Sequence, residues 1–299
     1  MSAKTAIALL RAHLDHQASL GQTHVLLTDA GCDALEHLLK NPVTRRAAAR
    51  PQRVFEEPKS LPPPVEYKRP APKVPAGVID VPGNSIEEQL ANLAARAEAD
   101  PIPRGLGTLR DIMVFAVGNP RARLMFVGEA PGAEEERQRE PFVGPAGQKL
   151  TLIIENAMGI SRSDVYISNI CKFRPSTGEA QGTSNRAPTA DEMRACLPYI
   201  TTEIALIQPQ VIVALGATAS QGLGIDGPVG RLRGRFHEFA GISVMVTYHP
   251  SYIIRREQEG VTAGTEAKRA VWEDMLKVME KLGMTISAKQ RGFFLPKAG

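Results

Sequence analysis

Short, mostly apolar runs recur along the second half of the chain, and segments with helical periodicity separate them. The clearest runs are residues 124–127, 165–170, 210–215 and 242–247. Runs of this length, bounded by turn residues, are typical of buried β-strands. Strands that alternate with helices predict a parallel sheet covered on both faces. We therefore expect an α/β fold: a three-layer α/β/α sandwich around a central, mainly parallel four-stranded sheet.

Capping residues mark where the predicted helices begin and end. Ser85-Ile-Glu-Glu88 and Thr189-Ala-Asp-Glu192 have the pattern of a capping box, so a helix is expected after each. Another helix is expected to begin near Pro145 and to end before Gly159. The last predicted helix spans about residues 266–281.

The first 83 residues have a different character. Residues 1–41 place Ile7, Leu10 and Leu14 at helical spacing, which predicts a small helical N-terminal segment. Residues 42–83 contain ten prolines and eight Arg or Lys residues. Because proline cannot donate to a helix or a sheet ladder, we expect this stretch to be a disordered, basic linker. It is explained either as a solvated spacer or as a tether for a phosphate backbone.

The composition supports one folded domain after the linker. Of the 299 residues, 43% are hydrophobic and 23% are charged, which is enough for a sizeable core. We place this domain at residues 84–285 and treat residues 286–299 as a C-terminal tail. The net charge of +4 favours polyanionic partners only weakly.

The cysteines and the apolar runs indicate in which cellular compartment the protein is expected. Cys32, Cys171 and Cys196 are spaced too widely for a disulfide framework or a metal-binding motif, which suits a reducing environment. The N-terminus has no signal-peptide-like apolar run, and no run approaches the ~18 residues needed to span a bilayer. We therefore expect a cytoplasmic protein without a membrane partner.

Three polar segments follow predicted strands and carry the candidate chemistry. They are residues 129–142, 169–174 and 248–256. The carboxyl ends of parallel strands share one edge of a sheet, and α/β proteins bind their ligands there. The three segments are therefore expected to surround one site.

Four motifs occur in order along these segments: Gly-Glu-Ala-Pro-Gly at 128–132, Pro-Phe-Val-Gly-Pro-Ala-Gly at 141–147, Ser-Asn-Ile-Cys-Lys-Phe-Arg-Pro at 168–175 and Thr-Tyr-His-Pro-Ser-Tyr at 247–252. Together they resemble the uracil-DNA glycosylase superfamily, most of all its family 4, whose members carry an iron–sulfur cluster. The resemblance covers about residues 85–283. It implies a monofunctional DNA repair enzyme that flips deoxyuridine out of DNA, hydrolyses its N-glycosidic bond and leaves an abasic site. We expect the protein to be a monomer.

Asn169 is the residue that the resemblance implies for reading uracil. Uracil presents an N3–H donor beside the O4 acceptor, and an Asn amide offers one acceptor and one donor to match them. Cytosine has the opposite pattern and would leave both partners unpaired. By itself, the residue fits a turn at a strand end equally well.

Phe142 and His249 complete the implied base site. The resemblance places the Phe142 ring against the flipped base, where stacking contributes about 1–3 kcal/mol. The sequence alone would favour a core phenylalanine. The resemblance gives His249 the role of donating to uracil O2, where negative charge develops as the bond breaks. A single histidine is otherwise more often structural.

Glu129, Ala130 and Glu135 are also implied to lie near the base. Ala130 occupies the position where other branches of the superfamily have a water-activating Asp. Glu135 matches an acid of the family that orients water, excludes the thymine methyl group or balances the sugar cation. We predict Glu135, Asn169 and His249 to be catalytic, with Glu129 and Ala130 contacting uracil. For Glu135 the alternative is a solvated surface acid.

Five residues are expected to contact DNA. The resemblance gives Ser251 a phosphate and makes Tyr252 and Ile253 the wedge that fills the vacated stack. Arg255 and Arg256 would support the phosphate backbone, or else lie in a solvated turn.

The family's four cluster cysteines are mostly absent. Only Cys196 falls in register, the third position is Phe173, and Cys171 lies two residues earlier. Because a [4Fe–4S] cluster needs four thiolates, we expect no cluster and no other metal or cofactor. Apolar packing around Phe173 and Leu197 is expected in its place.

Two other functions fit the same residues. One is a catalytically weak or inactive relative that binds damaged DNA or other nucleic acid. The other is a hydrolase of free nucleosides or nucleotides. The N-terminal segment is a candidate binding site for a repair or replication protein.

Overall fold

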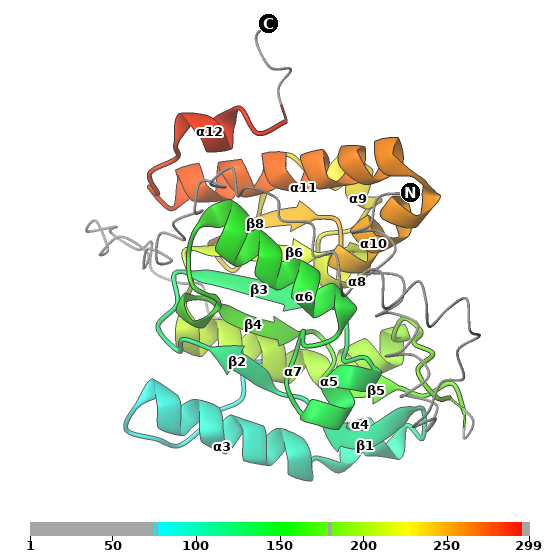
Figure 1. The fold of residues 1–299 in the computed structure, drawn as a ribbon. Coiled ribbons are helices and arrows are strands. Elements are labelled where there is room, and N and C mark those ends of the chain that lie inside the picture. The colour runs from blue at the N-terminus through cyan, green and yellow to red at the C-terminus, as the bar shows by residue number, and fades with distance from the viewer. Residues whose placement is uncertain (1–74, 76, 179–180, 295–299) are drawn as a thin grey trace, which may run out of the picture. The chain divides into compact units, whose positions relative to one another are not determined.

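The computed structural model describes residues 75, 77–178 and 181–294 (Figure 1). The predicted helical segment at 1–41 and most of the predicted linker lie outside this part of the chain.

A six-stranded sheet forms the centre of the domain, in the order β2-β4-β3-β6-β8-β7. The four inner strands are parallel, which confirms the predicted sheet. Antiparallel β2 and β7 extend it at the two edges, and β1 and β5 form a separate antiparallel pair. The strands are β1 Leu109–Met113, β2 Ala116–Gly118, β3 Leu124–Gly128, β4 Tyr166–Asn169, β5 Phe173–Pro175, β6 Val211–Leu215, β7 Phe236–Phe239 and β8 Ile242–Thr247.

Helices cover both faces of this sheet (Figure 1). On one face, α6, η1 and α11 pack against Leu124 and Phe126 of β3. On the other face, α7 and α8 pack against Met125 and Val127 of the same strand. Every residue of β3, β4 and β6 is buried, because a strand covered on both faces has no solvent side. The three-layer α/β/α sandwich is confirmed.

The helices agree with the predicted starts and stops at several points. Ser85 and Thr189 are the N-caps of α3 and α7, and Gly159 ends η1 in the left-handed conformation. The helices are α3 Ile86–Ala99, α4 Pro101–Gly105, α5 Ala133–Gln138, α6 Pro145–Leu152, η1 Ile153–Met158, η2 Arg162–Asp164, α7 Ala190–Ile207, α8 Ala217–Gly222, α9 Val229–Leu232, α10 Pro250–Glu259, α11 Val261–Lys281 and α12 Ala288–Arg291. None of the helices in this part of the chain is long and apolar enough to cross a membrane.

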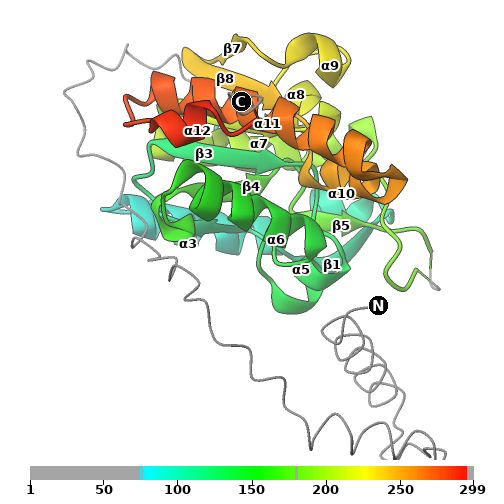
Figure 2. The ribbon, with the colours of Figure 1, turned by 45° about the horizontal axis from the view of Figure 1, so that its top comes forward.

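The folded domain extends beyond the predicted bounds on both sides. Before residue 84, Val81 is buried and the Ile79 N–H donates to Thr202 Oγ1 of α7 over 2.8 Å. After residue 285, helix α12 lies along α11 (Figure 2). There Trp272 Nε1 donates to the Gln290 carbonyl over 3.0 Å. These contacts fix segments that composition alone assigned to a linker and a tail.

The segment 248–256, predicted as a loop, is largely the helix α10. Pro250 occupies its first turn, where a missing N–H and a fixed φ are tolerated. His249 is the N-cap, and its side chain accepts from the Ser251 N–H. Pro250 therefore starts a helix at the point where a loop was expected. Helix α11 likewise begins at Val261, earlier than the predicted residue 266.

Candidate active site

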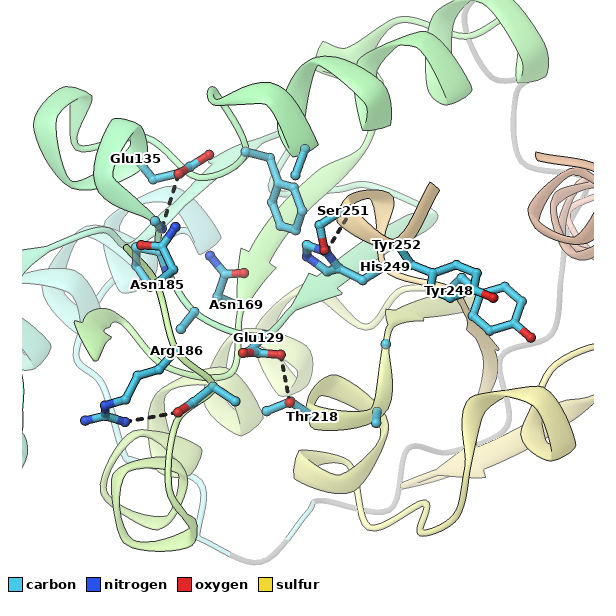
Figure 3. Close-up of a pocket in the computed structure, with 18 of the residues that line it drawn as sticks. Glu129, Glu135, Asn169, Asn185, Arg186, Thr218, Tyr248, His249, Ser251 and Tyr252 are labelled. Atoms are coloured by element: carbon cyan, nitrogen blue, oxygen red, sulfur yellow. Dashed lines mark hydrogen bonds between the residues drawn. The ribbon is translucent and has the colours of Figure 1, made fainter. Parts of the chain in front are cut away.

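A cavity of about 750 Å³ opens at the carboxyl ends of the parallel strands (Figure 3). All three predicted segments contribute to its lining, including Phe142, Asn169 and His249. The three segments therefore meet at one edge of the sheet, as the rule for the ends of parallel strands predicted.

Asn169 ends β4, and its side chain faces the cavity. The residue is 2% exposed, and its Oδ1 has no hydrogen-bond partner among the described residues. Buried polar atoms are normally paired, so an unpaired oxygen at a cavity wall points to a ligand. Gly128 of β3 makes room for it, since a Cβ there would lie 2.3 Å from Asn169 Oδ1 and 2.4 Å from Phe142 Cζ.

The buried ammonium group of Lys172 bonds the backbone of Asn169. Lys172 Nζ donates to the Asn169 carbonyl over 2.9 Å and to Ser168 Oγ over 2.7 Å. It also forms an ion pair with Glu203 of α7, and both side chains are fully buried. Tyr166 donates its hydroxyl to the same carboxylate. This network fixes the chain at the point where β4 leaves the sheet.

Phe142 lies beside the histidine in an unusual backbone conformation. Its φ of 58° is in the left-handed region, which few non-glycine residues adopt. The residue is 6% exposed, and its ring centroid lies 5.8 Å from that of His249. The ring therefore forms one side of the cavity, close to both Asn169 and His249.

The bonds at His249 define its tautomer. The Ser251 N–H can only donate, and it points at His249 Nδ1 over 3.2 Å. Ser251 Oγ lies 2.8 Å from the same nitrogen. Nδ1 is therefore an acceptor, and the ring proton sits on Nε2. Burial, aided by the charge of Arg255, lowers the pKa of His249 to about 4, so the ring is neutral at pH 7.

The three residues of the first loop have different environments. Glu129 lines the cavity, and its Oε2 accepts from Thr218 Oγ1 over 2.8 Å. Ala130 lines the cavity without a polar group. Glu135 also lines it, but its oxygens accept from the N–H groups of Gly132, Val143 and Gly144 at 3.2, 3.1 and 2.8 Å.

Three of the five residues predicted to contact DNA line the cavity: Ser251, Tyr252 and Arg255. Figure 3 shows Tyr252 turned away from Asn169 and stacked on Tyr248, with centroids 4.4 Å apart. Arg256 lies on the same helix and pairs with Glu259.

Ile253 corrects one prediction. It is 2% exposed and packs in the core against the helices that cover the sheet. Because α10 is a helix and not a loop, residues 252 and 253 point in different directions. A buried side chain cannot enter a base stack, so Ile253 is not part of the wedge.

Several cavity residues were not predicted from the sequence, among them Thr218 and Asn185. Thr218 follows β6, so the rule for strand ends would have indicated it. Asn185 comes from the long loop after β5 and lines the cavity, with its Oδ1 accepting from buried Arg174 Nε over 2.9 Å. Arg174 in turn pairs with Glu136, and no local sequence pattern signals that contact.

The region of the family's cluster holds an apolar core. Phe173 is fully buried and packs with Leu109, Cys171, Met193 and Cys196. Both of these cysteines are buried and free, and Cys32 lies outside the described residues. Three cysteines in the whole chain cannot supply four thiolates, so the residues do not fit a [4Fe–4S] cluster. The described residues contain no group of three or more His, Cys, Asp or Glu side chains that could hold a metal ion.

The chain is similar to known DNA glycosylases. The model of the uracil DNA glycosylase superfamily matches residues 115–276. The chain is 40% identical over 172 residues to the Type-4 uracil-DNA glycosylase of Thermotoga maritima, covering 56% of this chain and 82% of that protein. It is 36% identical over 174 residues to the Type-4 enzyme of Saccharolobus solfataricus, covering 55% and 74%. It is 31% identical over 151 residues to the Type-5 enzyme of Pyrobaculum aerophilum, covering 45% and 63%.

These observations define a class of protein. It is an α/β protein with an amide, an aromatic ring and an imidazole around one cavity at the ends of its strands. The chain belongs to the uracil-DNA glycosylase superfamily, and its similarity to Type-4 enzymes confirms the resemblance to family 4.

Proposed function

We propose that this protein is a uracil-DNA glycosylase of DNA repair, which hydrolyses the N-glycosidic bond of deoxyuridine flipped out of DNA. The observation that carries the proposal is the buried, unpaired Oδ1 of Asn169 beside Phe142 and His249 in one cavity. The relatives named Type-4 uracil-DNA glycosylase support the same conclusion.

Asn169 reads the base. Its Oδ1 accepts from uracil N3–H, and its Nδ2 donates to O4. Cytosine presents an acceptor at N3 and a donor at C4, so its polar groups would be left unpaired against the same amide. Lys172 donates to the backbone carbonyl of Asn169, which fixes the position from which this side chain extends into the cavity. Phe142 stacks on the base and supplies affinity that is independent of its hydrogen-bonding edge.

His249 stabilises the leaving group. As the N-glycosidic bond breaks, negative charge develops on uracil O2. The neutral ring has one N–H left after Nδ1 accepts from Ser251, and that Nε2–H is the donor for O2. A neutral donor placed beforehand stabilises the developing anion without gaining a proton first.

Water attacks the sugar, and Ala130 leaves no carboxylate at position 130 to activate it. Glu129 is the acid whose carboxylate faces the cavity with an orientation set by Thr218. We assign it the placing of the attacking water. Glu135 bonds the backbone of its own loop on both oxygens, which favours a role in shaping that loop.

DNA binds across the mouth of the cavity. Ser251 and the cations of Arg255 and Arg256 face the phosphate backbone, and Tyr252 with its partner Tyr248 fills the gap left by the flipped base. The monomeric state, the cytoplasmic location and a repair or replication partner for residues 1–83 stay predictions from the sequence.

The protein works without an iron–sulfur cluster in this proposal. The buried core around Phe173 and the Arg174–Glu136 ion pair hold the loops that a cluster would otherwise hold.

The purified chain tests the proposal on two labelled oligonucleotides that differ only in one uracil or cytosine. We expect uracil release with the chelator EDTA present, no cytosine release, and no stoichiometric iron in the same preparation. Binding of the uracil oligonucleotide without any alkali-sensitive product would instead favour the inactive DNA-binding relative. Release of uracil from free deoxyuridine alone would favour the nucleoside hydrolase.

A further inference from the structure

The loop that carries Phe142 is held in an unfavourable conformation. A phenylalanine at a φ of 58° is strained, and such strain persists only where the surroundings enforce it. The backbone also lies tightly on helix α6, since a Cβ at Gly147 would meet the Phe142 carbonyl carbon and oxygen at 1.9 Å. Some feature of the chain must hold this loop in place.

Two side chains of opposite charge bond the backbone of this loop: a carboxylate accepts from its N–H groups, and a guanidinium donates to its carbonyls. On one side, Glu135 accepts from the N–H groups of Val143 and Gly144 at 3.1 and 2.8 Å. On the other side, Arg162 Nη2 donates to the carbonyls of Pro141 and Phe142 at 2.8 and 3.1 Å. The groups on both sides of the strained residue are therefore fixed by charge-assisted hydrogen bonds.

Arg162 lies outside every motif that carries the family resemblance. It begins the short helix η2, and its side chain is 18% exposed. Its Nη1 donates to Thr151 Oγ1 of α6 over 3.2 Å, and Glu140 Oε1 lies 3.9 Å from Nη2. Its guanidinium thus joins the loop to the helix that follows it. It is absent from the lining of the cavity and so does not contact the base.

We infer that Arg162 is a positioning residue for uracil excision: it holds the Phe142 carbonyl so that the ring stays at stacking distance from the flipped base. This inference rests on the proposed function. The guanidinium suits the task because its planar fork can bond the loop carbonyls and Thr151 together. A lysine carries its donors on a single nitrogen and so cannot reach the loop carbonyls and Thr151 in the way that Nη1 and Nη2 do.

Arg162→Ala and Arg162→Lys test the inference in the full chain. The assay is single-turnover excision from a uracil oligonucleotide, combined with inhibition by free uracil, which reports on stacking without DNA. For Arg162→Ala we expect excision to fall at least about 10-fold and the inhibition constant for uracil to rise about 10-fold. Binding to duplex without uracil should stay within about 2-fold, because the phosphate contacts are unchanged. Arg162→Lys should fall between the wild type and Arg162→Ala in both assays.

Arg137→Ala is the matched control, because it removes an exposed cation of the neighbouring helix α5, whose partner among the described residues is Glu134 of the same helix. It should leave excision and inhibition unchanged. Wild-type values of both quantities in folded Arg162→Ala would overturn the inference. If Arg162→Ala does not fold, the lysine variant decides: an unchanged inhibition constant would then overturn the inference. Failure of the wild type itself to release uracil would reject the proposed function instead.

Discussion

The two walls of the cavity present their key side chains in different ways. Asn169 ends a strand that is paired on both sides, with β2 and with β3. Its carbonyl is bonded by a buried lysine, and the next residue donates to the Gly128 carbonyl over 3.0 Å. Phe142 belongs to no strand or helix and has a strained backbone that two charged side chains hold.

Because of this difference, substitutions behind the two walls should affect the stability of the fold and the activity of the site to different degrees. The Asn169 wall is part of the core, so a change behind it disturbs the whole domain. The Phe142 wall is a loop at the surface of the core, so a change behind it disturbs the site first. Substitutions behind the two walls should therefore give different ratios of lost stability to lost activity.

Among the substitutions that keep Asn169, Phe142 and His249, Gly128→Ala should have the largest effect on activity, because it disturbs both walls at once. The added methyl group would lie 2.3 Å from Asn169 Oδ1 and 2.4 Å from Phe142 Cζ, so both side chains must move. A misplacement of about 1 Å can lower catalysis by about 100-fold, and we expect a loss of that order here. Single-turnover uracil release measures it. Gly105→Ala is the control, because no atom lies within 4 Å of its added methyl group.

Lys172→Met should mainly lower stability. It leaves the fully buried carboxylate of Glu203 without its cation, and burial already raises the pKa of that carboxyl. Breaking a buried ion pair in this way costs about 3–5 kcal/mol, and removing both charges recovers most of it. Urea unfolding of Lys172→Met and of Lys172→Met/Glu203→Met measures the two values. Tyr166→Phe, which removes only a hydroxyl from Glu203, should lose much less. Equal losses in all three variants would contradict the importance of the ion pair.

The smallest expected effect is on the acid limb of the pH profile. With a pKa of about 4 in the folded protein and an ordinary value of 6.5, His249 stays neutral down to about pH 5. Titration of His249 should therefore leave the rate of excision unchanged between pH 8 and pH 5. Below pH 5 the rate should fall, because Nδ1 gains a proton and can no longer accept from the Ser251 N–H. As the pH falls, the unfolded chain takes up this proton before the folded protein does. The titration of His249 therefore lowers the free energy of unfolding between pH 6.5 and pH 4. Arg255→Gln removes a charge that lowers the pKa, so it should move the acid limb slightly upwards. The rate must be measured with saturating enzyme.

The sequence predicted what depends on local pattern and on the rules of α/β folds. The four parallel strands, the three layers and the meeting of Asn169, Phe142 and His249 at one edge all follow from apolar runs and strand ends. The edge strands β2 and β7 were harder to predict, because they are short and only partly buried. Helix α10 was missed because the same Pro that starts a helix also ends many others.

Long-range contacts explain the rest. Ile253 is buried only because α10 packs on α6 and α11, which no local pattern reveals. Arg162 and Arg174 reach carbonyls and carboxylates up to 38 residues away in the chain. Asn185 enters the cavity only through such a contact. A single sequence contains these pairings but gives no sign of which charges meet.

The most direct test of the account is the single-turnover rate of uracil release by three proteins: the wild type, Asn169→Ala and His249→Ala. The account predicts that the wild type releases uracil and that each substitution lowers the rate by orders of magnitude while the duplex is still bound. Rates in both variants that match the wild type would contradict the account, because the amide and the imidazole would then have no part in the chemistry of this cavity.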